Sequence, residues 1–415
     1  MKRTLAILLC AALLLSICGC GIGSLSSGNA VIPTDPPTEP SGTVPAEPTL
    51  PMQTVPPTEP VPTEPLIPAY QLPLTSISIS PVQETDTTES WDTVFTYTYP
   101  DITFLHQDAE VARTVLLDLR NRVEAYRKEA QSLKDHAGSI TEATGQAPGH
   151  SMSVTCEPMR VDQSVLSLLL TCTVESDVNA ATSADQFVTY DLVNGRPLML
   201  SHLLSQDATA DQLQTLLLDI LSQTEGLYSW YDEILEEQFA GNTLPENWYM
   251  SAEGLCFRFA AYELAPYALN VTVPYSRLSG LIRDRYYPPE APTPEGAVEV
   301  IPFEDADLSR FSSFAEVVLS PVDMAFLFYT DGTVSQLRIR QAACDAYPDT
   351  FTQGDVVFAT DTLCAGQAVR VQTYSESLFY VLHISYVSGG EYVSVYVLPN
   401  LIGSEDAAYI IQPNP

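Results

Sequence analysis

Proline is concentrated in one stretch near the N-terminus, and this stretch limits what the chain can fold into. Fourteen prolines fall between Pro33 and Pro73, several of them in Glu-Pro pairs. Because proline fixes φ and lacks a backbone N–H group, such a stretch cannot supply an interior helix or a central strand. We expect polyproline II structure in residues 20–74, where about 45 residues at ~3.1 Å each reach roughly 140 Å. The segment is predicted to be a disordered tether, and the alternative is a ligand for a proline-binding partner.

The residues before the tether resemble the export signal of bacterial lipoproteins. Two basic residues precede an apolar run at residues 4–17, which is as long as a signal's hydrophobic region and short for a membrane span. Ile17 stands three residues before Cys20 and Gly19 directly before it, where these signals place a branched and a small residue. Cys18 fits less well, because Ile17 then takes the place of the small residue. We expect cleavage of residues 1–19 and lipidation (palmitate) of Cys20, with an uncleaved anchor or a plain secretory signal as alternatives.

The rest of the chain has no segment that matches a membrane helix. No later stretch reaches the ~18–20 uninterrupted apolar residues of a span. Attachment to the membrane would rest on acyl chains, at ~0.8 kcal/mol per buried methylene. We therefore expect a lipoprotein on the outer face of the cytoplasmic membrane, with its folded part outside the cell.

The chain is strongly acidic, with 52 acidic and 18 basic residues and a formal net charge of −34. Loss of residues 1–19 removes Lys2 and Arg3, which leaves 16 basic residues and a charge of −36. Such a surface repels phosphate polymers, so no nucleic acid is expected as a partner, and it attracts basic proteins at long range. The simpler interpretation is that the charge keeps an exported protein soluble.

Five cysteines remain once the lipidated cysteine is set aside, an odd number. Cys156 and Cys172 flank a predicted hairpin turn and are one candidate disulfide, and Cys344 with Cys364 is another. Cys256 would then be free in an apolar strand. The alternative is that all five are buried thiols. No spacing is CxxC, so no metal site is predicted.

The segments after the tether predict two kinds of folded region. Alternating strands and amphipathic helices predict an α+β region, with a mixed or antiparallel sheet and packed helices, in two subdomains at residues 75–185 and 186–287. A second proline cluster predicts a linker at residues 288–296. Residues 297–415 carry strand patterns alone and predict a small all-β domain, a sandwich or barrel of roughly six or seven strands.

A long helix is predicted from Asp108 to Lys134, because apolar residues recur there at three- and four-residue steps. Asp108 can cap this helix, and Glu110 favours its first turn. The opposite face carries Arg113, Arg120, Arg122, Arg127 and Lys128. This basic face is either a docking surface or, more simply, a solvated helix face.

Three dipeptides predict hairpin turns between strands. Asn194-Gly195 predicts a type I′ turn, in which both residues take positive φ. Asp331-Gly332 and Gly389-Gly390 predict two hairpins in the C-terminal region.

Short motifs in the middle of the chain carry a resemblance. They are Tyr97-Thr98-Tyr99-Pro100-Asp101, Tyr190–Leu200, Trp248-Tyr249, Glu253-Gly254-Leu255, Tyr262–Ala268 and Val273-Pro274-Tyr275. On these motifs, residues 76–285 resemble the pair of extracellular domains of the lysozyme-responsive anti-sigma factor RsiV, which also accompanies the catalytic domain of the peptidoglycan deacetylase PdaC. The motif residues singled out are Tyr190, Asp191, Gly195, Trp248, Gly254, Pro266, Tyr267, Pro274 and Tyr275. Most of them are interpreted as determinants of the fold, since buried tyrosines usually satisfy a hydroxyl within the core.

The resemblance implies a binding or sensing role in the cell envelope. It implies lysozyme, another basic protein or a wall component as the partner, besides the membrane held through the lipid. The chain departs from RsiV because it has no sigma-factor-binding segment and no membrane span. It departs from PdaC because nothing in it resembles the metal-dependent catalytic domain.

Catalytic motifs are missing from the sequence. There is no HExxH pair, nucleophile elbow, P-loop or glycine-rich dinucleotide turn. Acidic pairs are too numerous among 52 acids to indicate a glycosidase. We therefore expect no enzyme, no catalytic residue and no cofactor, and a non-catalytic envelope lipoprotein. A wall-modifying enzyme accessory and a structural assembly lipoprotein are the alternatives.

Overall fold

The computed structural model describes residues 73–88, 92–176, 179–240, 245–290, 294–320, 324–346, 350–373, 381–399 and 409–413, all within the unit Pro65–Pro415. The predicted signal peptide, Cys20 and almost all of the predicted tether lie outside the described residues. Leu74, where the sequence predicts the folded part to begin, is buried. The first strand starts two residues later, at Ser76.

An eleven-stranded sheet contains most of the described strands, in the order β18-β17-β16-β13-β14-β1-β2-β3-β4-β5-β6. Their bounds are β1 Ser76–Thr87, β2 Thr93–Leu105, β3 His150–Val161, β4 Val165–Ser176, β5 Asn179–Asp191, β6 Arg196–Pro197, β13 Thr333–Ala346, β14 Thr350–Cys364, β16 Val381–Ser388, β17 Glu391–Pro399 and β18 Tyr409–Pro413. The pairs are antiparallel except β2 with β3, which is parallel. Strand β1 pairs with β2 on one side and with β14 on the other, where Ile77 faces Ala359. The first and last thirds of the chain therefore share one sheet.

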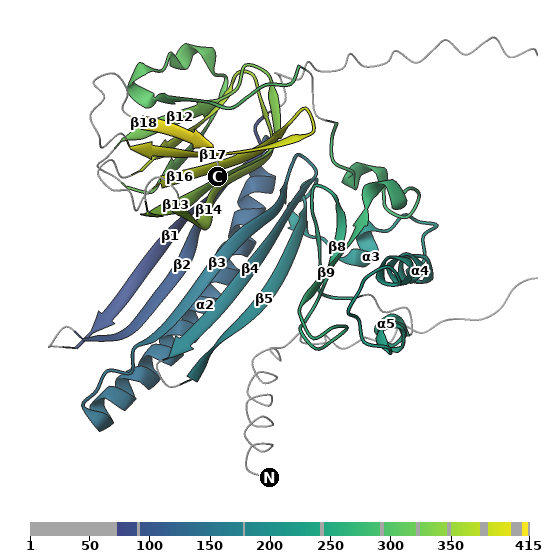
Figure 1. The fold of residues 1–415 in the computed structure, drawn as a ribbon, viewed down its shortest axis with the longest axis horizontal. Coiled ribbons are helices and arrows are strands. Elements are labelled where there is room, and N and C mark those ends of the chain that lie inside the picture. The colour runs from purple at the N-terminus through teal and green to yellow at the C-terminus, as the bar shows by residue number, and fades with distance from the viewer. Residues whose placement is uncertain are drawn as a thin grey trace, which may run out of the picture. The chain divides into compact units, whose positions relative to one another are not determined.

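Helix α2 (Ala109–Thr144) lies against β2 and β3 of this sheet (Figure 1). Asp108 caps it as predicted, because its side chain accepts hydrogen bonds from the backbone N–H groups of Glu110 at 2.8 Å and Val111 at 3.2 Å. Val115 and Leu119 are buried in the apolar core between the helix and the sheet. The amphipathic stripe thus positions the helix as its spacing predicts.

The same helix is ten residues longer than predicted, since it ends at Thr144 and not at Lys134. Gly145 ends it in the left-handed conformation, with φ 72°, and donates its N–H to the carbonyl of Thr141. The prediction followed the apolar stripe and missed this glycine, which is the usual residue after a helix C-terminus.

A four-stranded sheet packs against the C-terminal strands of the large sheet. Its order is β10-β12-β15-β11, with β10 Glu299–Pro302, β11 Ser313–Val318, β12 Ala325–Tyr329 and β15 Gln367–Gln372. Phe326 and Phe328 of this sheet share an apolar core with Ile339, Phe358 and Ile384 of the large one. The fold class, an α+β region followed by an all-β region, is confirmed, and the all-β part is a sandwich of two sheets.

The two glycine turns predicted in this region have opposite outcomes. Gly389 and Gly390 join β16 to β17 with φ of 61° and 77°, so this hairpin is confirmed. The hairpin at Asp331-Gly332 is wrong, because β12 and β13 belong to different sheets. Gly332 instead permits a close backbone approach: a Cβ there would lie 2.6 Å from the carbonyl oxygen of Glu295.

The turn at Asn194-Gly195 closes a hairpin of a different type from the one predicted. Strands β5 and β6 pair through Tyr190 and Asp191, so residues 192–195 form a four-residue loop. In this loop only Gly195 has a positive φ, 69°, which excludes type I′. Asp191 organises the turn, since its Oδ1 accepts the N–H of Val193 at 3.0 Å.

A three-stranded sheet and short helices form the region between β6 and the sandwich. The bounds are β7 Trp248–Met250, β8 Gly254–Phe259, β9 Leu269–Pro274, α3 Leu200–Leu203, α4 Ala210–Leu221 and α5 Tyr231–Phe239. Single 3-10 turns lie at Tyr275–Arg277, Asp284–Tyr286, Phe303–Asp305 and Leu308–Arg310. Leu213 and Leu217 of α4 and Leu235 of α5 are buried in one core with Phe257 and Val273 of the sheet. Thr209 and Gln212 close a capping box at the start of α4.

All five described cysteines are buried, and Cys156, Cys172, Cys256 and Cys364 are free thiols. The register explains why Cys344 and Cys364 do not pair: Cys344 lies opposite Phe351, and Cys364 lies opposite Thr333. Thr333 and Cys344 are eleven residues apart on β13, which is about 36 Å at the rise of a strand. Cys156 and Cys172 lie opposite other residues, namely Leu170 and Val154. The buried-thiol alternative describes this structure.

A buried arginine joins three regions of the chain. Arg160, at the end of β3, is 0% exposed. Its Nε donates to Asp162 Oδ2 at 2.6 Å, and its Nη1 donates to the Tyr275 hydroxyl at 2.6 Å and to the Tyr286 carbonyl at 2.7 Å. Asp361 of β14 accepts the N–H of Val161 at 2.9 Å nearby. We call Arg160, Asp162, Tyr275 and Tyr286 the arginine junction.

The structure does not test the predicted boundaries between parts of the chain. The division into residues 1–19, 20–74, 75–185, 186–287, 288–296 and 297–415 stays a prediction.

Candidate functional site

Exposed aromatic side chains lie in two loops of the region that holds α4 and α5. Tyr262 is 76% exposed, Trp230 50% and Tyr267 45%. Tyr228 stacks on Trp230 with ring centroids 5.0 Å apart and nearly parallel planes. Solvent-exposed aromatic rings of this size are enriched at protein interfaces. We call Tyr228, Trp230, Tyr262 and Tyr267 the aromatic face.

One backbone and one side-chain hydrogen bond hold the two loops of the aromatic face together. The N–H of Tyr228 donates to the carbonyl of Leu264 at 2.9 Å, and the Tyr267 hydroxyl donates to the carbonyl of Glu225 at 2.9 Å. Tyr262 has a φ of 69°, in the left-handed region that a bulky residue rarely adopts. Such a conformation costs on the order of 1–3 kcal/mol and persists only where the surroundings impose it. The loop therefore presents the Tyr262 ring to solvent at an energetic cost.

The chain around the aromatic face is acidic. Residues 197–257 contain ten acidic residues and no lysine or arginine. They are Asp207, Asp211, Asp219, Glu225, Asp232, Glu233, Glu236, Glu237, Glu246 and Glu253. Glu225, Asp232 and Glu233 are exposed beside the aromatic residues. Exposed rings combined with negative charge favour a basic or hydrogen-bonding partner, because the charge steers the encounter and the rings supply contact area.

Most of the motif residues singled out in the sequence lie inside the fold. The Tyr190 hydroxyl donates to Asp118 Oδ2 at 2.7 Å, and Asp191 Oδ2 accepts from Arg285 Nη2 at 2.9 Å. Trp248 is buried at the edge of the three-stranded sheet, Pro274 ends β9, and Tyr275 belongs to the arginine junction. Tyr267, with the exposed Pro266 before it, is the motif residue that reaches the surface as part of the aromatic face.

The two motif glycines serve close backbone approaches. A Cβ at Gly254 would lie 2.1 Å from the carbonyl oxygen of Val273, and one at Gly195 would lie 2.9 Å from the carbonyl oxygen of Val111. A larger residue at either position would push a strand or helix α2 away.

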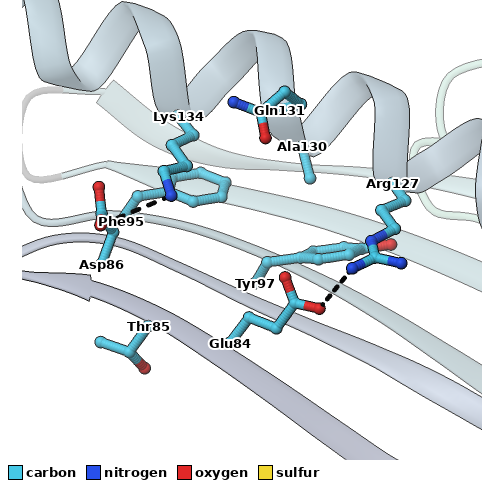
Figure 2. A pocket seen from close by; sticks show the side chains of 9 residues that line it. All are labelled: Glu84, Thr85, Asp86, Phe95, Tyr97, Arg127, Ala130, Gln131 and Lys134. Carbon is cyan, nitrogen blue, oxygen red and sulfur yellow. Dashed lines mark hydrogen bonds and ion pairs between the residues drawn. The ribbon is translucent and has the colours of Figure 1, made fainter.

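A separate pocket lies between α2 and the hairpin of β1 and β2, and Figure 2 shows the side chains around it. It has a volume of 240 Å³. Its lining residues are Glu84, Thr85, Asp86, Phe95, Tyr97, Arg127, Ala130, Gln131 and Lys134, and we call it the α2 pocket. The helix contributes residues at three- and four-residue steps, which share one face. The strands contribute two facing pairs, Glu84 with Tyr97 and Asp86 with Phe95.

Two ion pairs cross the α2 pocket from the helix to the sheet. Arg127 Nη2 lies 3.0 Å from Glu84 Oε1, and Lys134 Nζ lies 3.5 Å from Asp86 Oδ1. All four side chains are about half exposed, so each pair contributes little to stability. Part of the basic helix face predicted from the sequence, Arg127, thus lines a pocket.

Among the described residues, no three histidine, cysteine, aspartate or glutamate side chains are grouped to hold a metal ion. Within the same segments, no helix combines the length and apolarity needed to cross a membrane.

These features define an α+β protein with exposed aromatic side chains in the loops of its helical region. Residues 203–276, which include the whole aromatic face, match the family model DUF3298, described as a protein of unknown function. The chain therefore contains a DUF3298 domain. Two solved structures of this family are similar to the chain at 14% identity. The match with a Bacteroides fragilis protein covers 51% of this chain and 94% of that protein's chain, with a TM-score of 0.36. The match with a Pseudomonas aeruginosa protein covers 54% of this chain and 100% of that protein's chain, with a TM-score of 0.35. A search of curated proteins gives no match.

The sequence alone did not predict a functional site at the aromatic face or at the α2 pocket. Helix α5 begins at Tyr231, so Tyr228 and Trp230 lie in the loop before it, which Gly226 enters with a φ of 80°. Glu84 and Arg127 are 43 residues apart, and no local pattern connects them.

Proposed function

We propose that this protein is a non-catalytic binding or sensing module of the cell envelope, held outside the cell by a lipid on Cys20, and that the aromatic face is its binding surface. The observation that carries the proposal is the set of four aromatic side chains, three of them exposed, of which Tyr228 and Trp230 lie in a chain segment of ten acids and no basic residue. The resemblance of residues 76–285 to RsiV and PdaC supports the extracellular role.

The expected partner is a basic protein, with lysozyme as the specific candidate. A partner of positive charge is attracted by the acidic segment, and tyrosine and tryptophan side chains supply the contact area on which most interface energy rests. A basic protein will also associate loosely with a chain of net charge −34 at low salt, without any specific site. Specific binding must therefore persist at physiological salt, where the long-range attraction between charges is screened.

The test is titration of the full chain in mild detergent with lysozyme, at low and at physiological salt. We expect saturable one-to-one binding at both salt concentrations, and a loss of affinity of about tenfold or more for Trp230→Ala, as for an interface hot spot. Tyr392→Ala is the matched control, because Tyr392 is 68% exposed but lies in β17, outside the DUF3298 domain.

Two outcomes contradict the proposal for this partner. Binding that disappears at physiological salt reports charge alone. If the Trp230→Ala and Tyr392→Ala variants bind lysozyme equally strongly, the contact lies outside the aromatic face. The same titration with cell-wall fragments in place of lysozyme tests a glycan or peptide partner at the aromatic face.

A further inference from the structure

The α2 pocket has a buried polar group that the protein itself leaves without a partner. Tyr97 is 3% exposed, and its hydroxyl has no hydrogen-bond partner among the described residues. Burial raises the pKa of this hydroxyl above its usual value, so it remains protonated and able to donate at neutral pH. A buried donor without an acceptor costs on the order of 1–3 kcal/mol. The hydroxyl is closed to solvent in the structure, so a ligand that reaches it by a small shift of the surrounding side chains would remove that cost.

The pocket has charges of both signs at each of its two ends. Glu84 and Arg127 stand at one end, and Asp86 and Lys134 stand at the other, with Phe95 and Tyr97 between them (Figure 2). Figure 2 also shows the Tyr97 hydroxyl on the side of Arg127. Two hydrogen-bond donors, one of them charged, thus lie at the first end, which suits a carboxylate.

Arg127 can bind such a carboxylate without giving up its present partner. A guanidinium has five N–H donors, and Arg127 makes one hydrogen bond to Glu84, at 3.0 Å. At the other end, Lys134 and Asp86 are 3.5 Å apart and both are about half exposed. A ligand ammonium can replace the lysine there, because the flexible lysine stem lets its charge move into water.

The distance between the two ends limits the length of the ligand. Glu84 and Asp86 are two residues apart on a strand, about 7 Å. Arg127 and Lys134 are seven residues apart on a helix, about 10 Å. A single amino acid is too short to bridge them, whereas an extended dipeptide reaches about 7 Å. The volume of 240 Å³ is below the ~300–1,000 Å³ typical of sites for larger ligands.

We infer that the α2 pocket binds a zwitterionic dipeptide. Its carboxylate accepts hydrogen bonds from Arg127 and from the Tyr97 hydroxyl, and its ammonium binds Asp86. This site is separate from the aromatic face, so the inference does not depend on the proposed partner.

The first experiment is calorimetric titration of the full chain with dialanine. N-acetyl-dialanine removes the ammonium, dialanine amide removes the carboxylate, and alanine shortens the ligand. We expect measurable binding of dialanine and at least tenfold weaker binding of the other three, since each loses one charged contact or the span between the two ends.

The second experiment repeats the dialanine titration with variants. Tyr97→Phe removes the hydroxyl and keeps the ring, and we expect an affinity about tenfold lower. Arg127→Gln and Asp86→Asn should each lower it by at least as much. Arg120→Gln is the matched control, because Arg120 is an exposed arginine of the same helix that does not line the α2 pocket. It should leave the affinity unchanged.

The inference fails if dialanine gives no saturable binding in the millimolar range. It also fails if N-acetyl-dialanine binds as well as dialanine, or if Tyr97→Phe binds as the wild type does. Lysozyme binding by Tyr97→Phe should equal that of the wild type, which separates failure of this site from failure of the aromatic face.

Discussion

The arginine junction and the α2 pocket contain the same chemical groups in different surroundings. Each joins an arginine to a carboxylate and includes a tyrosine. Arg160 is 0% exposed and makes three hydrogen bonds, including those to Asp162 and Tyr275. Arg127 is half exposed, with one hydrogen bond to Glu84, and the nearby Tyr97 hydroxyl makes none within the described segments.

The comparison teaches how to distinguish a polar cluster that holds a fold from one that is available to a ligand. In the arginine junction, burial makes each hydrogen bond necessary, because a group that loses its partner cannot turn to water. In the α2 pocket, water and therefore a ligand can reach the charged groups, whereas Arg160 Nη2, which also has no partner among the described residues, is closed off by burial. We therefore expect substitutions in the arginine junction to lower stability, and substitutions in the α2 pocket to lower ligand affinity with little effect on stability.

The largest expected effect is from Arg160→Met. Removal of the arginine leaves Asp162 buried without its cation, and breaking a buried pair in this way costs about 3–5 kcal/mol. We expect the free energy of unfolding in urea to fall by that amount. Arg120→Gln serves as the control, with a change below about 0.5 kcal/mol. A loss from Arg160→Met no larger than that of the control would contradict a structural role for the arginine junction.

His383 extends the comparison to a buried group that titrates. Its Nε2 shares a hydrogen bond with the Ser394 hydroxyl at 2.7 Å, and burial, with Arg340 nearby, lowers its pKa to about 4. Between pH 6.5 and about 4 the unfolded chain binds a proton that the folded protein excludes, so stability falls as the pH decreases through this range. The contribution reaches about 3 kcal/mol. Urea unfolding at pH 7 and pH 4.5 should show a smaller pH effect for His383→Gln than for the wild type, and an equal effect would disprove the assignment.

A small effect is expected from Arg127→Gln. The pair with Glu84 is half exposed, and pairs of that kind contribute about 0–1 kcal/mol. Urea unfolding should give a loss within that range, decreasing further in high salt. A loss comparable to that of Arg160→Met would remove the distinction between the two arginines.

The smallest effect is expected from Tyr97→Phe. Because the hydroxyl has no partner, its removal deletes an unsatisfied buried group, and stability should stay equal or rise by up to about 1 kcal/mol. Thermal unfolding in the absence of ligand measures this change. A clear decrease would mean that the hydroxyl is bonded within the protein.

Local signals in the sequence predicted local structure well. Asp108 predicted the start of α2, and Gly389-Gly390 predicted the hairpin of β16 and β17, because caps and tight turns depend on residues a few positions apart. The hairpin predicted at Asp331-Gly332 was wrong, because this dipeptide is typical of a turn but the structure needs Gly332 for another purpose. The backbone at Glu295, 37 residues away, approaches it closely.

The candidate sites were less accessible to sequence reasoning. Tyr262 lies in a recognised motif, but the motif does not predict its positive φ, in a turn where its N–H donates to the carbonyl of Ala265 at 2.7 Å, or its exposure. The α2 pocket requires the pairing of Glu84 with Tyr97 and the packing of α2 on both. The candidate disulfide between Cys344 and Cys364 could not be decided from the sequence, because strand register cannot be derived from spacing alone.

The position of β1 between β2 and β14 has a consequence for how the chain acquires its structure and resists force. The hydrogen bond from the Thr360 hydroxyl to the carbonyl of Thr75 joins residues 285 positions apart, and Ile77 faces Ala359 across the strands. A chain that emerges N-terminus first cannot complete the second edge of β1 until residue 359 is available, so the final ordering of its first strand waits for synthesis of most of the protein. Once formed, a pull on the chain at Pro73 acts along β1, and the hydrogen bonds to both neighbouring strands must shear together rather than open one by one.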